Sequence, residues 1–214
     1  MLLAIDTATR VMSLALIDDD GIAAEQTLRT RNQQTVQLTA AIHHLLTLLD
    51  TSVESLTALA IAEGPGSFSG LRVGFGVAKG LALARNLPLI PVPTLDIIAH
   101  GSPYYEGRLL AVIQAGRGRI IAGGYEWRDE RWQSADAPQI TSWEAVVRQD
   151  ETLINGEIDA RGHDLLREAG KTCVSAGGRL RRAGFLAELG WTAFRDGDYP
   201  EEAAEVNPKY LKEP

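Results

Sequence analysis

Short apolar runs separated by polar turns make up the first part of the chain. Three such runs lie at 2–5, 11–17 and 22–29. Apolar runs of this length, bounded by Asp- and Gly-containing turns, predict a meander of strands. From about residue 33 to 49 the apolar residues instead recur every three to four positions. That spacing predicts a helix with one buried face.

The same order of strands and helices recurs further along the chain. A predicted buried strand at 57–62 leads into a glycine-rich stretch, and a strand at 87–92 follows it. Later strands are predicted at 108–114, 119–126 and 152–155, and later helices at about 142–149, 157–169 and 179–196. The repeated order predicts an α/β protein of two similar units, 1–101 and 102–214, with a Gly-Ser-Pro boundary near 101. Whether the C-terminal segment packs back on the first unit is left open.

Composition narrows the class of protein. The 214 residues are 45% hydrophobic and 23% charged, which is ordinary for a globular protein. The apolar runs fall short of the roughly 20 residues that span a bilayer, and the start, MLLAIDTAT, lacks the basic region of a signal peptide. The net charge of −7 argues against broad nucleic-acid binding by this chain alone, although a partner could supply a basic surface. The single Cys173 excludes an internal disulfide and suits a reducing cytosol, so we expect a cytoplasmic protein.

Residues 64–84, GPGSFSGLRVGFGVAKGLALA, contain six glycines. Three familiar glycine motifs fail here by one residue. The dinucleotide fingerprint has Ser69 where it needs glycine, and Lys79 lacks the flanking Gly and Ser/Thr of a phosphate-binding Walker loop. The nucleophile elbow has Phe68 where it needs serine. We therefore expect no catalytic residue in this stretch.

A helix explains the glycine spacing better. Pro65 ends any upstream helix, and Ser67 or Ser69 can cap a new one. Helical geometry then gathers the small residues on two nearly opposite faces. One, the Gly70 face, consists of Gly70, Gly74 and Ala78; the other, the Gly76 face, consists of Gly76, Gly80 and Ala84.

Two glycine faces on one helix need a compensating reason. Each glycine inside a helix destabilises it by about 0.5–1 kcal/mol relative to alanine. Close approach of another backbone to each face supplies such a reason. One neighbour is the protein's own sheet, and the other is either its own second half or another subunit. Arg72 and Lys79 share a further face and predict a basic stripe beside the Gly76 face.

Four segments carry a resemblance to a known family. The opening LLAIDTAT, the block GPGSFSGLRVGFGVAKGLA, the segment PVPTLDIIA and the terminal NPKYLK resemble the bacterial tRNA threonylcarbamoyladenosine biosynthesis protein family TsaB, also called YeaZ. The resemblance implies an actin/Hsp70/sugar-kinase-like (ASKHA) fold of two lobes, each a mixed sheet flanked by helices. It also implies a non-catalytic partner of the TsaD subunit. With the ATPase TsaE, that complex transfers threonylcarbamoyl to N6 of the adenosine beside the anticodon of certain tRNAs.

In the family, the helix begun by the glycine block contacts TsaD, or a second copy of the chain when TsaD is absent. For this chain the resemblance implies an interface of Gly66, Ser67, Phe68, Gly70, Leu71, Arg72, Val73, Gly74, Gly76, Val77, Lys79 and Gly80. It implies no cofactor in this chain, with ATP or ADP and metal bound only where TsaD and TsaE are present. Contact with tRNA is then made only through the complex, and no membrane is involved.

Three departures from the family pattern stand out. Gln34-Thr35 replaces a usual His-Ser, and Lys212 stands where arginine is usual. Residues 114–121, QAGRGRII, replace a usual Asp-Ala-Arg-x-x-Glu-Val-Tyr block. The loss of that block puts a role for the second lobe's cleft in doubt and leaves the first-lobe interface untouched.

The turn Asp6-Thr7-Ala8-Thr9 lies where kinases of this fold wrap phosphate with Asp-x-Gly-x-Thr. Ala8 replaces the glycine that would let backbone amides close on a phosphate. We therefore interpret Asp6, Thr7 and Thr9 as a vestigial phosphate turn with a structural role.

Other candidate residues give weaker signals. His43 and His44 are adjacent and point about 100° apart, so they cannot chelate one ion, and we expect no metal site. His100 and His163 are isolated in the sequence, and Cys173 is expected to be a small buried hydrophobe.

Arg179, Arg181 and Arg182 are expected to open the last helix as a solvated face, with an acidic partner or RNA as the alternative. Two other functions stay open for the chain as a whole. One is an autonomous ATPase or kinase of the ASKHA type, and the other is a relative of metallopeptidases that share this fold.

Overall fold

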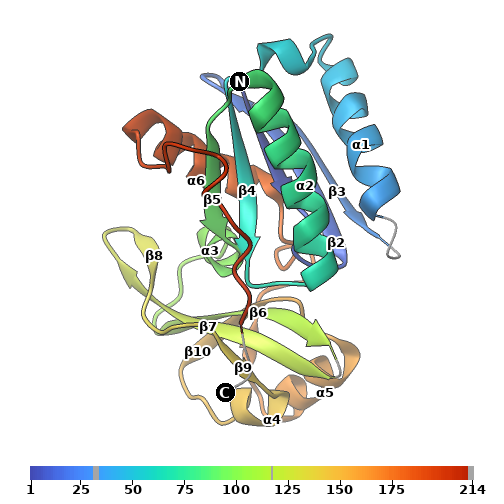
Figure 1. The fold of residues 1–214 in the computed structure, drawn as a ribbon. Helices are drawn as coiled ribbons and strands as arrows, with labels where there is room; N and C mark the ends of the chain where they lie inside the picture. The colour runs from blue at the N-terminus through green and yellow to red at the C-terminus, as the bar shows by residue number, and fades with distance from the viewer. Residues whose placement is uncertain (31–33, 117, 212–214) are drawn as a thin grey trace. The chain divides into compact units, whose positions relative to one another are not determined.

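The computed structural model describes residues 1–30, 34–116 and 118–211, and it divides into two compact units (Figure 1). The first unit contains residues 1–97 and 182–209, and the second contains 98–181 with residues 210 and 211. The observed division thus falls between Ile97 and Ile98, where the sequence suggested 101 and 102. It also assigns a long C-terminal segment to the first unit.

The sheet of the first unit has the order β3-β2-β1-β4-β5. Its strands are β1 (Leu2–Asp6), β2 (Val11–Asp18), β3 (Gly21–Arg29), β4 (Ala58–Gly64) and β5 (Leu89–Pro93). The first three strands form the predicted antiparallel meander, and β4 and β5 extend the sheet in parallel with β1.

Helices cover both faces of this sheet (Figure 1). They are α1 (Gln34–Leu48), α2 (Phe68–Arg85) and α6 (Ala183–Asp196), with the short 3-10 helix η1 (Val53–Ser55) after α1. Alternation along β1 explains the two layers, because successive side chains point to opposite faces. Leu3 and Ile5 pack with α1 and α2, whereas Leu2 and Ala4 pack with α6.

The second unit repeats the strand order of the first. Its sheet runs β11-β10-β6-β7-β8, with β9 paired to β7. The strands are β6 (Arg108–Gly116), β7 (Arg119–Arg128), β8 (Arg131–Ser134), β9 (Gln139–Thr141), β10 (Thr152–Gly156) and β11 (Thr172–Cys173). As in the first unit, an antiparallel meander is extended by parallel strands. The helices are α3 (Thr94–His100), which begins in the first unit, α4 (Trp143–Val146) and α5 (Ala160–Glu168).

One predicted helix was too long, and four short elements were not predicted. The helix expected at 142–149 is a single turn, and β8, β9, β11 and α3 were not predicted. These are short segments of two to seven residues, whose periodicity is too brief to read. The predicted first residue of α1, residue 33, lies outside the described part of the chain.

The last helix begins at Ala183, not near 179, so the three arginines precede it instead of opening it. Ser13 Oγ accepts a hydrogen bond from the Ala183 N–H at 2.8 Å and satisfies one donor of the helix start. Arg181 is buried and pairs with Glu157 at 3.0 Å. Arg182 pairs with Glu25 through three hydrogen bonds. The expectation of a solvated arginine face is therefore wrong for Arg181, and Arg182 is held by the chain's own carboxylate.

Candidate protein–protein interface

The glycine block forms the end of β4, a tight connection and all of α2. Ser67 is the N-cap of α2, and its Oγ accepts from the Gly70 N–H at 3.4 Å. Asn86, in the left-handed conformation with φ 51°, ends the helix. The prediction of a capped helix starting near Ser67 is confirmed.

The Gly70 face packs inside the first unit. A methyl group added at Gly70 would overlap the carbonyl oxygen of Thr7, and one added at Gly74 would overlap Oγ1 of Thr7. Thr7 Oγ1 also donates a hydrogen bond to the Gly70 carbonyl at 2.8 Å. Leu71 beside them is fully buried. Gly70, Leu71 and Gly74 therefore face the chain's own core and do not belong to a surface that a partner could touch directly.

The Gly76 face is open. Methyl groups added at Gly76 or Gly80 would have no described atom within 4 Å. Two large apolar side chains of α2 are exposed to solvent near these glycines. Phe68 is 56% exposed, and Leu83 is 87% exposed. The Arg72 guanidinium carbon lies 3.9 Å from the centre of the Phe68 ring, a cation–π contact that fixes both side chains. We call Phe68, Arg72, Gly76, Gly80 and Leu83 the α2 stripe.

Lys79 does not join Arg72 in a basic stripe. Its Nζ donates to the Ala204 carbonyl at 2.9 Å and to Asn207 Oδ1 at 3.2 Å. Both acceptors belong to the chain's own C-terminal segment. The ammonium group is therefore engaged inside the first unit, and the prediction of two cations offered beside the Gly76 face is wrong for Lys79.

Helix α1 lies beside α2 on the same face of the sheet (Figure 1). Val36 and Leu48, near its two ends, are exposed apolar residues. On α2, Val73 and Val77 are half-buried and pack on the core under the two helices. Exposed apolar side chains are therefore present on both helices of this face.

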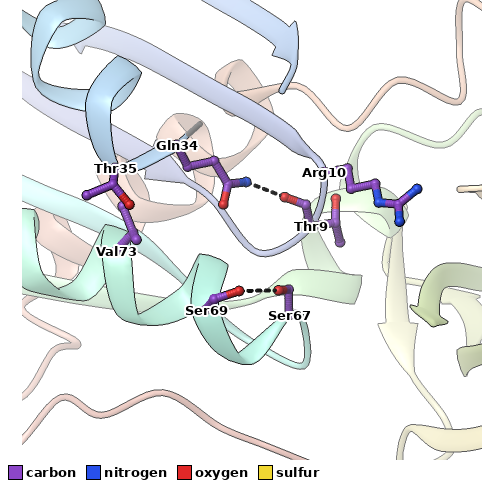
Figure 2. A pocket seen from close by; sticks show the side chains of 7 residues that line it. All are labelled: Thr9, Arg10, Gln34, Thr35, Ser67, Ser69 and Val73. Atoms are coloured by element: carbon purple, nitrogen blue, oxygen red, sulfur yellow. Dashed lines mark hydrogen bonds between the residues drawn. The ribbon is translucent and has the colours of Figure 1, made fainter. Parts of the chain in front are cut away.

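The turn between β1 and β2 is tied to both helices. Asp6 Oδ1 accepts from the Ala8 N–H at 2.9 Å, and the Ser67 N–H donates to the Ala8 carbonyl at 2.6 Å. Gln34 Nε2 donates to the Thr9 carbonyl (Figure 2). The carbonyls of Ala8 and Thr9 thus accept hydrogen bonds from the starts of α2 and α1. They also give Gln34, one of the departures from the family pattern, a local role.

A small hollow lies between this turn and the two helices (Figure 2). It is lined by Thr9, Arg10, Gln34, Thr35, Ser67, Ser69 and Val73 and has a volume of about 90 Å³. The hydroxyls of Ser67 and Ser69 lie 3.3 Å apart along its edge. Pockets for small-molecule ligands usually measure about 300–1,000 Å³. The hollow, as formed by the described residues, is smaller than this range.

In the second unit, Gln114 is held by Glu157. The Gln114 N–H donates to Glu157 Oε2 at 3.2 Å, and Gln114 Nε2 donates to the Glu157 carbonyl at 3.0 Å. The other carboxylate oxygen of Glu157 pairs with Arg181. Arg117 of the altered 114–121 block and Lys212 near the C-terminus lie outside the described residues. For Gln114 the contacts describe a structural link between β6 and the residue after β10.

A wider groove of about 460 Å³ lies on the sheet of the second unit. Its lining includes Arg108, Gly124, Asp136, Thr141 and Asp150. Arg108 and Asp136 form an ion pair directly over Gly124, where a side chain would collide with both. Sequence reasoning did not anticipate this groove, because its residues come from four strands and two loops without a shared motif.

The described residues include no group of three or more His, Cys, Asp or Glu side chains placed to hold a metal ion. His43 and His44 are both exposed on α1. Cys173 is half-buried, and burial raises the pKa of its thiol, so the thiol stays protonated at neutral pH. Within the described ranges, no helix is long and apolar enough to cross a membrane.

Comparisons with known proteins identify similar families, sequences and structures. A family model described as TsaD, tRNA N6-adenosine threonylcarbamoyltransferase, matches residues 21–172. The tRNA threonylcarbamoyladenosine biosynthesis protein TsaB of Escherichia coli (strain K12) is 38% identical over 160 residues, which cover 73% of this chain and 68% of that protein. TsaB of Bacillus subtilis (strain 168) is 30% identical over 128 residues, 60% of this chain and 56% of that protein, so this match spans little more than half of the relative.

A solved structure described as YeaZ from Pseudomonas aeruginosa is similar over nearly the whole chain. It has a TM-score of 0.78 and 25% sequence identity, and the match covers 98% of this chain and 99% of that one. The two mixed sheets flanked by helices have the ASKHA-like arrangement that the resemblance implied. From the family model and these relatives together, the chain belongs to the TsaB (YeaZ) family of tRNA threonylcarbamoyladenosine biosynthesis proteins.

Proposed function

We propose that this chain is a non-catalytic subunit that binds a TsaD subunit through the α2 stripe and so supports threonylcarbamoylation of tRNA. The observation that carries this proposal is the open space over Gly76 and Gly80, bordered by exposed Phe68 and Leu83. The names of the relatives and of the family model point to the same reaction.

No described atom of the chain comes close enough to Gly76 or Gly80 to require a glycine there. In a helix each is less favourable than alanine by about 0.5–1 kcal/mol. A partner helix that crosses α2 at Gly76 and Gly80 would bring two backbones close together, which supplies the missing compensation. Covering Phe68 and Leu83 would add about 1.5–3 kcal/mol for each side chain fully buried.

The proposal assigns the chemistry to the partners. TsaD carries out the transfer, and TsaE joins a larger complex that binds ATP or ADP and metal. The tRNA contacts this chain only within that complex, in the cytoplasm. Without TsaD, the same stripe pairs with a second copy of the chain, because a self-complementary apolar face favours a two-fold dimer.

Co-purification with TsaD tests the proposal directly. The purified chain is mixed with purified TsaD, and the complex is resolved by size-exclusion chromatography. A tRNA modification assay then compares TsaD and TsaE with and without this chain. We expect a stable complex and modification that depends on the chain. Absence of a complex, or equal modification without the chain, would contradict the proposal.

A binding experiment separates the other two functional classes. The isolated chain is titrated by calorimetry with magnesium–ATP and, separately, with zinc. We expect no binding site with a Kd of about 1 mM or lower, which corresponds to a binding free energy on the order of −4 kcal/mol. An ATP site in the isolated chain would support an autonomous ATPase or kinase. A zinc site would support a metallopeptidase relative.

A further inference from the structure

An extended C-terminal segment crosses the first unit beside β4 and α2. We call residues 204–209 the strap; it is part of the red segment that runs alongside these elements in Figure 1. The Lys209 N–H donates to the Glu63 carbonyl at 2.7 Å, as a residue of an added strand would. Val206 is buried with the side chains under α1 and α2. The strap is therefore built into the fold of the first unit.

Two lysines fix the strap at different points. Lys79, on α2, donates to the Ala204 carbonyl at 2.9 Å and to Asn207 Oδ1 at 3.2 Å. Lys209, on the strap itself, pairs with Glu63 Oε1 at 2.8 Å. The Glu63 side chain is only 6% exposed, whereas that of Lys209 is 72% exposed. A carboxylate buried to this degree depends on its cation, because removing one partner leaves an uncompensated charge.

The two attachment points lie at either end of the first two-thirds of α2. Glu63 is followed by Gly64, the last residue of β4, which has φ 114°. A side chain at Gly64 would overlap the carbonyl oxygen of Lys209, so the strap lies directly against the point where the chain leaves β4. Lys79 lies about three turns further on, because α2 starts at Phe68. The strap thus connects the segment before α2 with the third turn of the helix.

Lys79 also lies between a residue of the core and a residue of the open face of α2. Ala78 before it is fully buried in the core, and Gly80 after it belongs to the α2 stripe. A bond from Lys79 to the strap therefore restrains rotation of the helix about its own axis, which is the motion that would turn the stripe away from a partner. Close packing at a functional site tolerates an error of only about 0.5 Å or 10–20°.

We propose that Lys79 and Lys209 are positioning residues that, through the strap, hold the α2 stripe in the orientation that a partner helix requires. This inference rests on the proposed function, because it assumes that the partner docks on the stripe. The two motifs GPGSFSGLRVGFGVAKGLA and NPKYLK are far apart in the sequence, and the strap contacts give them one shared task. Preorganisation of this kind raises affinity by reducing the ordering needed on binding.

The test measures the affinity of the purified chain for purified TsaD by calorimetry. Lys79→Met keeps the aliphatic stem and removes the hydrogen bonds to the strap. Its matched control is Arg85→Met, which removes a bond from the C-terminal end of α2 to the Glu54 carbonyl, away from the strap. Hydrogen exchange of residues 204–209 and the melting temperature are recorded for each variant.

We expect Lys79→Met to weaken TsaD binding at least tenfold and to speed amide exchange in the strap, whereas Arg85→Met changes affinity less than twofold. The melting temperature should shift by less than about 4 °C, because an exposed hydrogen bond is worth little in the free chain. Lys79→Arg, which retains a donor, should recover most of the affinity.

Three outcomes would overturn the inference. Unchanged affinity with a released strap would show that the strap does not position the stripe, and unchanged exchange would show that Lys79 does not hold it. A loss of affinity that tracks a large fall in melting temperature would show a purely structural role.

Gly76→Leu in the same assay separates the two proposals. If Gly76→Leu abolishes binding and Lys79→Met does not, only the strap inference fails; if Gly76→Leu binds normally, docking on the stripe is wrong as well.

Discussion

In both units a helix follows the strand that pairs in parallel with the first strand of the sheet, but α2 and α5 differ in length and surface. Helix α2 has 18 residues, and its outward side carries open glycines and exposed apolar side chains. Helix α5 has 9 residues, and its outward side carries charged residues. Arg161 pairs with Glu144, and Arg167 pairs with Asp164 at 3.0 Å. Water and local ion pairs satisfy the surface of α5, whereas the surface of α2 is left with apolar area uncovered.

The approach to the two helices is nevertheless the same. Gly64 ends β4 with φ 114°, and Gly156 ends β10 with φ 115°. In each case a side chain would overlap a carbonyl oxygen, that of Lys209 in the first unit and that of Val112 in the second. The shared backbone therefore reflects the repeated architecture, and the difference in function lies in the side chains that each helix presents. Of the two helices, we assign partner binding to α2.

The largest expected effect is at the inner face of α2. Gly74→Leu should destabilise the first unit by about 3 kcal/mol or more, because the added side chain has to displace Thr7 and Ile61. Urea unfolding followed by circular dichroism measures the loss. Gly76→Leu, on the open face, is the matched control and should keep or slightly raise the unfolding midpoint, because leucine favours a helix more than glycine does. A normal midpoint for Gly74→Leu would mean that this face is not packed on the sheet.

A buried glycine also lies on the inner face of α5, where Gly162 is the third residue of the helix, as Gly70 is the third residue of α2. A methyl group there would overlap the indole ring of Trp143, which is almost fully buried. Gly162→Ala should therefore destabilise the second unit by about 1–3 kcal/mol. The exposed neighbour His163 provides the control, and His163→Ala should leave the same unfolding curve unchanged. Equal curves for the two variants would show that α5 does not pack tightly on α4.

Gln114→Ala tests whether the altered block of the second unit has a chemical role. The variant loses the side-chain bond to the Glu157 carbonyl, so we expect a loss of about 1 kcal/mol in stability. Modification of tRNA by the reconstituted complex should stay within about threefold, or roughly 0.7 kcal/mol. A hundredfold loss of modification with the complex still assembled would reveal a role for Gln114 in the reaction.

The smallest expected change is a gain in stability. Gly80→Ala places a methyl group in open space on a helix, so it should stabilise the isolated chain by about 0.5–1 kcal/mol. Chemical denaturation of the wild-type chain and the variant measures the difference. The same variant should weaken TsaD binding, because the methyl group separates the two backbones. Stabilisation without any loss of binding would place the partner elsewhere on α2.

The sequence predicted the longer elements because their periodicity extends over many residues. The meander, the capped α2 and the presence of two separate glycine faces on it follow from spacing and cap chemistry. The interface residues themselves stay a prediction, although the burial of Gly70, Leu71 and Gly74 narrows the set.

Contacts between segments distant in sequence were not predictable. Periodicity places Lys79 on a helical face, but it cannot show that the strap arrives 125 residues later to bind it. The same limit applies to Arg181, whose partner Glu157 is 24 residues earlier and on another element. The motif NPKYLK carries only a resemblance in the sequence, whereas the structure shows that its Lys209 pairs with Glu63.

The most direct measurement of the central claim is the affinity of TsaD for Gly76→Leu. The chain and TsaD are purified separately, and binding is measured by calorimetry alongside the melting temperature of the isolated chain. We predict at least a tenfold loss of affinity, about 1.4 kcal/mol, with a melting temperature close to that of the wild-type chain. Wild-type affinity in a folded Gly76→Leu variant would contradict the assignment of the α2 stripe as the docking surface.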